Sequence, residues 1–143
     1  MKFSYEEFKA KSIAKGCTEA DFTPEIDENI KDLVKRINAL GYKPPMYFSS
    51  CLRSKEHHKQ IYLKKGVSED KIPWGSRHLT GQAADVADPD GELRRFLNTT
   101  IIPWDKIGLW MEDTKYTPGW IHFQSCPPSA GNRFFIPESC GLK

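Results

Sequence analysis

The sequence predicts an α+β domain with a small, mainly antiparallel sheet packed against helices. The expected elements follow in the order helix, helix, strand, helix, strand, helix, strand, strand, which is typical of this class. The last two strands, 107–111 and 120–124, are joined by a loop rich in Thr, Pro and Gly, as expected of an antiparallel pair. With 143 residues the chain is expected to form one domain over residues 1–143.

Two helices are expected at the start of the chain. A short amphipathic helix spans residues 5–14 and is ended by Gly16. The clearer helix begins after Thr23, a favoured N-cap, with Pro24 at its first position, and Gly41 ends it. Its apolar side chains fall at helical spacing and are expected to face the core: Ile26, Ile30, Leu33, Val34, Ile37 and Leu40.

The middle of the chain is expected to contain a strand, a helix and a polar loop. Residues 46–50 form a short buried strand, and Ser54 caps a helix that runs to about Lys65. In the loop 67–76, a Pro-Trp-Gly turn is placed to form one wall of a cleft. His57 and His58 are adjacent in the helix, so they cannot share a face, and both are expected to be exposed to solvent.

A further strand and helix precede the final strand pair. Residues 81–86 are expected to form a strand whose small side chains suit burial beneath a helix, and Asp90 is expected to cap a helix over residues 91–98. From Cys126 onward the chain is rich in Pro and Gly and is expected to be irregular. Three apolar residues are expected to hold this tail on the body: Phe134, Phe135 and Ile136.

Composition excludes several classes of partner. The net charge of +2 is too small to indicate nucleic-acid binding. No apolar run is long enough to span a membrane, and the N-terminus lacks the apolar segment of a signal peptide. The chain is therefore expected in the cytoplasm of the producing cell, as a monomer, with any export provided by another agent.

The four cysteines are Cys17, Cys51, Cys126 and Cys140, and they contain no C-x-x-C pair. This spacing argues against a zinc knuckle. Free thiols are the favoured interpretation in a reducing compartment, while a Cys126–Cys140 bridge stays open because both residues lie in the tail.

The residues that carry chemistry lie in the segment 76–88 and in the last strand. His78 and Asp85 flank a run of small residues that opens with Gly81, and His122 follows in Trp-Ile-His-Phe-Gln. Two imidazoles and a carboxylate are ligands that a divalent metal such as Zn²⁺ binds. On an alternating strand, His122 points away from the side of its apolar neighbours and can face a cleft. We therefore predict a metal centre formed by His78, Asp85 and His122.

Three protein ligands leave one zinc position for water, as in zinc hydrolases. A carboxylate is then needed to accept a proton, and Glu112 and Asp113 are the acids at the end of the preceding strand. We favour Glu112. Arg53, which follows the strand 46–50, is suited to bind a substrate carboxylate through two parallel hydrogen bonds.

At these residues the chain resembles the zinc D-alanyl-D-alanine carboxypeptidase and L-alanyl-D-glutamate endopeptidase family, which shares its fold with the hedgehog signalling domain. The resemblance covers roughly residues 48–124. The family pattern S-x-H-x-x-G-x-A-x-D, followed by W-x-H, is matched by Ser76, His78, Gly81, Ala83, Asp85, Trp120 and His122. The family segment S-G-Y-R-S is similar to residues 49–54.

The resemblance implies zinc bound by the two histidines and the aspartate, and peptidoglycan stem or cross-link peptides as substrate. It implies that Arg53 lies near the substrate carboxylate, and we assign Ser76 and Trp120, which belong to the matched motifs, to substrate binding as well. The compact form resembles phage-encoded lysis enzymes (endolysins). Such a protein acts on the cell wall after release from the host cell, or is carried in a virion.

The chain departs from the family pattern at two places. Cys51 and Leu52 replace the usual glycine and aromatic residue in the substrate-binding segment. Gly119 stands three residues before His122, where many family members have a glutamate, so Glu112 would have to reach the metal from farther back in the chain.

Two other functions stay open from the residues. A non-haem iron oxygenase also uses two histidines and a carboxylate, although its first pair is closer in sequence and its barrel needs more strands. A non-catalytic zinc-binding or virion-structural module of the same fold would keep the ligands without turnover. Carboxypeptidase and endopeptidase activity are not distinguished by the sequence.

Overall fold

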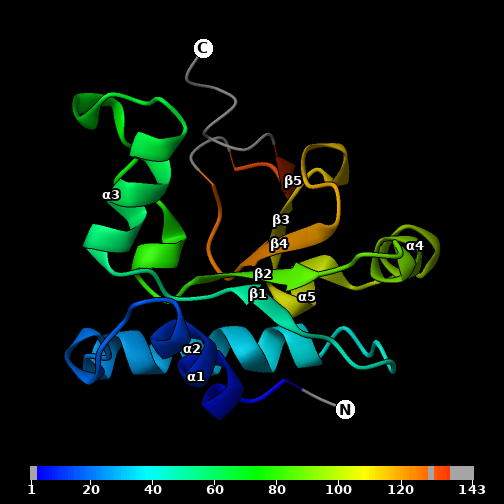
Figure 1. Cartoon of the computed structure of the whole chain (residues 1–143). Helices are drawn as coiled ribbons and strands as arrows, with labels where there is room; N and C mark the ends of the chain where they lie inside the picture. Colours follow the sequence, from blue (N-terminus) through cyan, green and yellow to red (C-terminus); the bar gives the residue numbers. More distant parts are fainter. Residues whose placement is uncertain (1–2, 129–130, 136–143) are drawn as a thin grey trace.

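The structure is a computed structural model that describes residues 3–128 and 131–135. These residues form an α+β fold, so the predicted class is confirmed (Figure 1). The helices of this part are α1 (Tyr5–Ala14), α2 (Pro24–Asn38), α3 (Lys55–Lys64), α4 (Glu92–Thr99) and α5 (Trp104–Ile107). The strands are β1 (Phe48–Ser50), β2 (Ala83–Ala87), β3 (Trp110–Glu112), β4 (Trp120–Gln124) and β5 (Phe134–Phe135).

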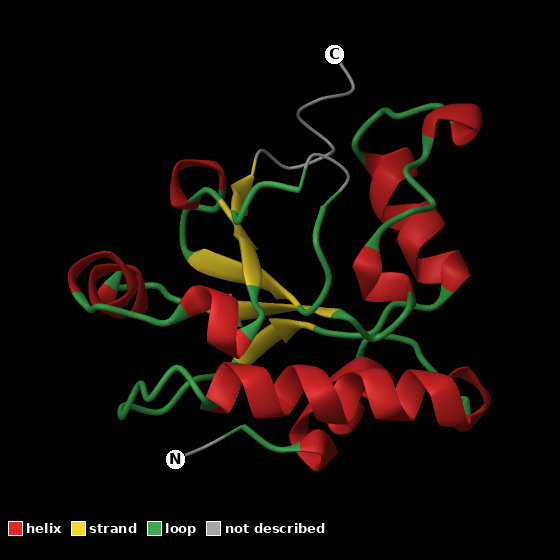
Figure 2. Cartoon of the chain, turned by 180° about the vertical axis from the view of Figure 1, so that it is seen from behind, coloured by secondary structure: helices red, strands yellow, loops and turns green. Residues whose placement is uncertain are grey.

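The five strands form one open, mixed sheet in the order β1-β2-β4-β3-β5. All neighbouring pairs are antiparallel except β3 and β5, which are parallel. Helices α1 and α2 lie beneath the sheet, with α3 to one side and α4 to the other (Figures 1 and 2). Four short 3-10 turns complete the described fold: η1 (Glu19–Asp21), η2 (Glu69–Lys71), η3 (Arg77–Leu79) and η4 (Thr114–Tyr116).

The start of α2 agrees with its sequence signals. The Thr23 hydroxyl accepts a hydrogen bond of 3.3 Å from the Ile26 amide, and Pro24 occupies the first helical position. The stripe predicted to face the core does so, with Ile30, Leu33, Val34, Ile37 and Leu40 buried. The apolar side of this helix therefore packs against the sheet.

Alternation along the two central strands separates the core from a polar face. Ala84 and Val86 of β2, and Ile121 and Phe123 of β4, are fully buried in the core. The residues between them point to the opposite side of the sheet. The polar residues of the two strands consequently lie on the face turned away from α1 and α2.

Gly81 lies where the chain passes close to α2, as suits the run of small residues that it opens. Its φ angle is +77°, and a Cβ atom there would lie 2.9 Å from Ile30 Cγ1 and 3.1 Å from the Ile26 carbonyl oxygen. Both the left-handed backbone and the close contact favour glycine. This packing brings the start of β2 onto α2 and fixes the turn that carries His78.

We expect Gly81→Ala to destabilise the fold more than Gly66→Ala does. Gly66 has a similar φ of +83° but nothing within 4 Å of the added carbon, so it isolates the backbone strain. The steric contact with α2 is expected to cost the Gly81 variant about 1–3 kcal/mol beyond that strain. Urea unfolding of both variants measures the difference, and equal losses would show that the contact with α2 does not matter.

The strand predicted over residues 107–111 is wrong at its start. Residues 104–107 form the short helix α5, and β3 begins only at Trp110. Gly108, with a φ of +78°, makes the turn between them, and Arg36 Nη1 donates hydrogen bonds to the carbonyl oxygens of Gly108 and Ser125 at 2.6 and 3.0 Å. A glycine in a left-handed conformation ends the helix and delays the strand.

The cap of α4 also differs from the prediction. Within the described part of the chain, Asp90 accepts one hydrogen bond, from the Glu92 amide at 3.2 Å, while the buried Asp88 carboxylate accepts from the amides of Leu93 and Arg94 at 2.9 and 3.0 Å. Asp88 can reach these amides because Gly91 adopts a left-handed turn before the helix. The prediction of a helix in this region is confirmed, but its main capping residue is Asp88.

The tail is more regular than expected, because Phe134 and Phe135 form β5 alongside β3. Ile136, which was expected to help hold the tail, lies outside the described residues. Cys17, Cys51 and Cys126 are free thiols, and Cys140 also lies outside the described residues. No helix in the described ranges is long and apolar enough to cross a membrane.

Candidate metal centre

His78 is placed by the 3-10 turn η3, just before β2. The Ser76 hydroxyl accepts a hydrogen bond of 3.4 Å from the His78 amide, and the His78 carbonyl accepts one of 3.0 Å from the Arg53 amide. These contacts tie the turn to the segment that follows β1. The imidazole is buried, with 4% of its residue surface exposed.

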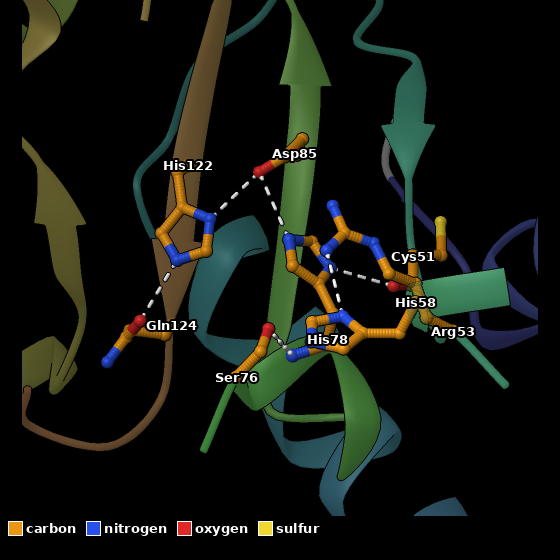
Figure 3. A network of polar contacts seen from close by, with 8 residues as sticks. All are labelled: Cys51, Arg53, His58, Ser76, His78, Asp85, His122 and Gln124. Carbon is orange, nitrogen blue, oxygen red and sulfur yellow. Dashed lines mark hydrogen bonds and ion pairs between the residues drawn. The ribbon is translucent and has the colours of Figure 1, made fainter. Parts of the chain in front are cut away.

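Asp85 and His122 face each other directly across β2 and β4. Side chains opposite one another on antiparallel strands lie on the same face of the sheet. The His122 Nδ1 atom is 2.8 Å from Asp85 Oδ1, and the His78 Nε2 atom is 3.4 Å from the same oxygen (Figure 3). The three donor atoms lie within 4.8 Å of one another. The structure therefore brings together the three residues that the sequence singled out.

Each imidazole is held from behind by a hydrogen-bond acceptor. His78 Nδ1 lies 2.8 Å from the Cys51 carbonyl oxygen, which can only accept, so Nδ1 carries the proton. Nε2 then keeps its lone pair, through which it can bind a metal. An outer partner of this kind fixes the tautomer and the ring orientation of a metal-binding histidine. His78 is thus presented through Nε2 toward Asp85.

His122 is held in the same way by Gln124. Its Nε2 lies 2.9 Å from Gln124 Oε1, and the Gln124 amide nitrogen donates to the Cys126 carbonyl at 2.9 Å (Figure 3). The second bond turns the amide oxygen toward the imidazole, because only the nitrogen can donate to a carbonyl. His122 therefore presents Nδ1 to Asp85, and the two histidines offer different ring nitrogens.

The geometry fits a small divalent ion. Two zinc–ligand bonds of about 2.1 Å separate their donor atoms by about 3.4 Å at a tetrahedral angle. The observed separations of 2.8 and 3.4 Å between the carboxylate oxygen and the two imidazoles are close to that value. The donor set, His–Asp–His with both outer ring nitrogens anchored, is suited to hold a metal.

Burial and charge set the protonation states of this group. Burial alone would raise the pKa of the Asp85 carboxyl, but the two imidazoles beside it hold that pKa far below its usual range. Burial lowers the pKa of His78, against the attraction of Asp85, and the positive charge of Arg53 lowers it further. Without metal, Asp85 is therefore ionised and His78 neutral at pH 7.

The pKa of His122 shifts in the opposite direction. Burial would lower it, but the hydrogen bond to Asp85 and the negative charge of Glu112 raise it to about 9. Without metal, this imidazole is therefore positively charged at pH 7, with a proton on each ring nitrogen. A metal ion that binds Nδ1 must displace this proton.

We expect Gln124→Leu to weaken zinc binding by about 10–100-fold, the usual effect of losing an outer-shell partner. Leucine keeps the bulk of the buried side chain but leaves His122 Nε2 without its acceptor. Competition with a zinc chelator measures the affinity. Gln60→Leu, on the exposed side of α3 where Gln60 bonds only to Glu56, is the control and should leave the affinity unchanged. An unchanged affinity in the Gln124 variant would contradict the role assigned to this residue.

Arg53 lies beside the metal centre and contacts His58, a residue that was predicted to be exposed to solvent. His58 is fully buried rather than exposed, and its Nδ1 lies 3.4 Å from Arg53 Nη1 (Figure 3). The prediction for His58 is wrong because Pro73 and Trp74 of the following loop fold back over α3 and cover it. His57 is half-buried and takes no part in the centre.

The other predicted site residues lie on β3 and β4 and at the starts of the turns η3 and η4. Glu112 ends β3, next to the strand of His122, and its charge acts on that imidazole. Asp113 caps the turn η4 by accepting from the Lys115 amide at 3.1 Å. Trp120 begins β4, two residues before His122 and on the same face. Ser76, as described above, supports the turn of His78.

The fold and the site define an α+β protein with a candidate His–Asp–His metal centre on the polar face of its sheet. No protein-family model, curated protein or solved structure matches the chain. The description of the protein as a candidate metal-binding protein therefore depends on the geometry of the centre.

Proposed function

We propose that this protein is a zinc-dependent peptidase that cleaves stem or cross-link peptides of peptidoglycan. The observation that carries the proposal is the convergence of His78 Nε2, His122 Nδ1 and Asp85 Oδ1, with both imidazoles anchored from behind. Three ligands that leave a position for water are typical of catalytic rather than structural zinc. Peptidoglycan as substrate comes from the family resemblance of the sequence.

Zinc bound in this centre would lower the pKa of its water to about 7 and polarise a peptide carbonyl. Glu112, on the strand beside His122, would accept the proton of that water and return it to the leaving amine. The negative charge of Glu112 raises the pKa of His122, which supports a position of Glu112 near the centre. Mutagenesis of Glu112 can test its role as base directly.

Arg53 would bind the carboxylate of the substrate. Its guanidinium makes no ion pair with any described acid, and its Nε is buried without a hydrogen-bond partner. A cation that keeps unused donors beside a metal centre is suited to bind an anionic group through two parallel bonds. Ser76 and Trp120 would complete the substrate site.

The open sheet weighs against an iron oxygenase. The described strands form a five-stranded sheet with free edges, whereas that class was expected to need a barrel with more strands. A non-catalytic zinc-binding or virion-structural module remains the alternative to the peptidase.

Digestion of purified peptidoglycan by the zinc-loaded protein tests the proposal. We expect new amino groups and, by mass spectrometry of defined muropeptides, products cut at a peptide bond next to a D-residue. Chelation and His122→Ala should abolish cleavage, while His57→Ala should not. Zinc binding without cleavage of several peptidoglycan types would overturn the peptidase and favour the non-catalytic module.

A further inference from the structure

His58 is buried on α3 in a way that its surroundings in the sequence do not explain. None of its surface is exposed, and its ring packs against Tyr62 and Trp74 at centroid distances of 4.9 and 5.4 Å. Its Nε2 lies 3.0 Å from the Pro73 carbonyl oxygen and its Nδ1 lies 3.4 Å from Arg53 Nη1. A buried polar side chain with two directed partners is held in one orientation.

The partners decide which ring nitrogen carries the proton. The Pro73 carbonyl can only accept, so Nε2 donates to it and Nδ1 keeps a lone pair. That lone pair faces a guanidinium, which can only donate (Figure 3). Burial lowers the pKa of His58, and the charge of Arg53 lowers it further, so the ring is neutral at pH 7.

A neutral acceptor serves Arg53 differently from a carboxylate. An aspartate or glutamate in this place would orient the guanidinium but would also neutralise it and occupy its donors. The imidazole orients one Nη1–H, and among the described residues it leaves the positive charge and the remaining side-chain donors without a partner. Arg53 is also tied to the metal centre through its backbone, because its amide donates a hydrogen bond of 3.0 Å to the His78 carbonyl oxygen.

We propose that His58 is the positioning residue of Arg53: it fixes the guanidinium beside the metal centre as an uncompensated cation that selects ligands with a carboxylate. This inference rests on the proposed function, in which Arg53 binds the substrate carboxylate. It adds that the loop of Pro73 and Trp74 sets the position of the Arg53 guanidinium through its contact with His58. Lys59 of α3 pairs with Glu69 of the same loop at 2.9 Å, which fastens the loop to the helix.

Two variants of similar polarity separate the two contacts of His58. In His58→Asn the side-chain oxygen stands near the position of Nδ1, so the acceptor for Arg53 is kept and the bond to Pro73 is lost. In His58→Gln the amide reaches the position of Nε2, so the bond to Pro73 is kept and the acceptor for Arg53 is lost. Cooperative unfolding and unchanged zinc affinity of both variants show that the fold and the centre are intact.

The first readout needs no ligand. Nitrogen-15 relaxation of the Arg53 Nε–H group in the zinc-loaded protein should give an order parameter of about 0.8 in the parent protein and in His58→Asn, and below about 0.6 in His58→Gln. Equal values in both variants, whether high or low, would overturn the inference. So would a loss confined to His58→Asn, because the loop contact would then be the one that matters.

The second readout compares N-acetyl-D-alanine with N-acetyl-D-alaninamide by calorimetric titration of the same zinc-loaded proteins. We expect the carboxylate to be preferred in the parent protein and in His58→Asn, and the preference to fall about tenfold in His58→Gln. No preference in the parent protein would contradict both the proposed role of Arg53 in substrate binding and the selection of carboxylate ligands inferred here, and the order parameters would still decide whether His58 holds Arg53. A preference that is unchanged in His58→Gln would overturn the inference while leaving the peptidase proposal intact.

Discussion

Asp85→Ala is expected to weaken zinc binding by more than about 100-fold. Asp85 is the residue that both imidazoles approach, at 2.8 and 3.4 Å, so its loss removes one ligand and the group that holds the other two together. Losing an outer-shell partner costs about 10–100-fold in affinity, and losing a direct ligand should cost more. Calorimetric titration of the metal-free variant with zinc at pH 7.5 measures the effect.

The matched control is His57→Ala, which removes a half-buried histidine outside the centre. Its zinc affinity should equal that of the parent protein. Retention of stoichiometric, tight binding in Asp85→Ala would show that zinc binds elsewhere, and the candidate centre would then be wrong.

The affinity for zinc is expected to rise about tenfold per pH unit between pH 6 and pH 7, below the range in which water bound to zinc would lose its own proton. The cause is His122, whose pKa is raised to about 9 in the metal-free protein, so that one proton must leave before Nδ1 can bind a metal. Below pH 9, each unit of acidity favours the protonated imidazole tenfold more over the form that binds. The pKa values of Asp85 and His78 are lowered, so neither adds a second proton in this range.

Chelator competition at about pH 6, 6.5 and 7 gives this slope, and calorimetry in buffers of different ionisation enthalpy counts the protons released. We expect about one proton per zinc at pH 6, where water bound to zinc would still keep its own proton. A flat affinity over the same range would contradict the protonated state assigned to His122. A slope corresponding to two protons would instead mean that a second ligand, most directly His78, is also charged before zinc binds.

Much of the centre could be predicted because its key contact follows from simple strand geometry. Asp85 and His122 each lie between residues of a strand that enter the core, so both must point to the other face. Their strands then needed only to be neighbours, which they are. Gln124 could have been found by the same reasoning, because it lies two residues after His122 on the same strand and so shares its face.

The errors arose where tertiary packing overrides local pattern. His58 is surrounded in sequence by charged residues, and only the return of the Pro73–Trp74 turn over α3 buries it. The acceptor for His78 is a backbone carbonyl, that of Cys51, which no side-chain pattern reveals. Gly108 likewise makes a turn inside an apolar run that looked like continuous strand.

X-ray absorption at the zinc edge of the zinc-loaded protein tests the central claim most directly. We expect a first shell of nitrogen and oxygen only, at about 2.0–2.1 Å, with the outer scattering of two imidazoles. A sulfur ligand at about 2.3 Å would mean that a cysteine binds the metal, and the absence of imidazole scattering would remove His78 and His122 from it. Either result would contradict a centre formed by two histidines and an aspartate.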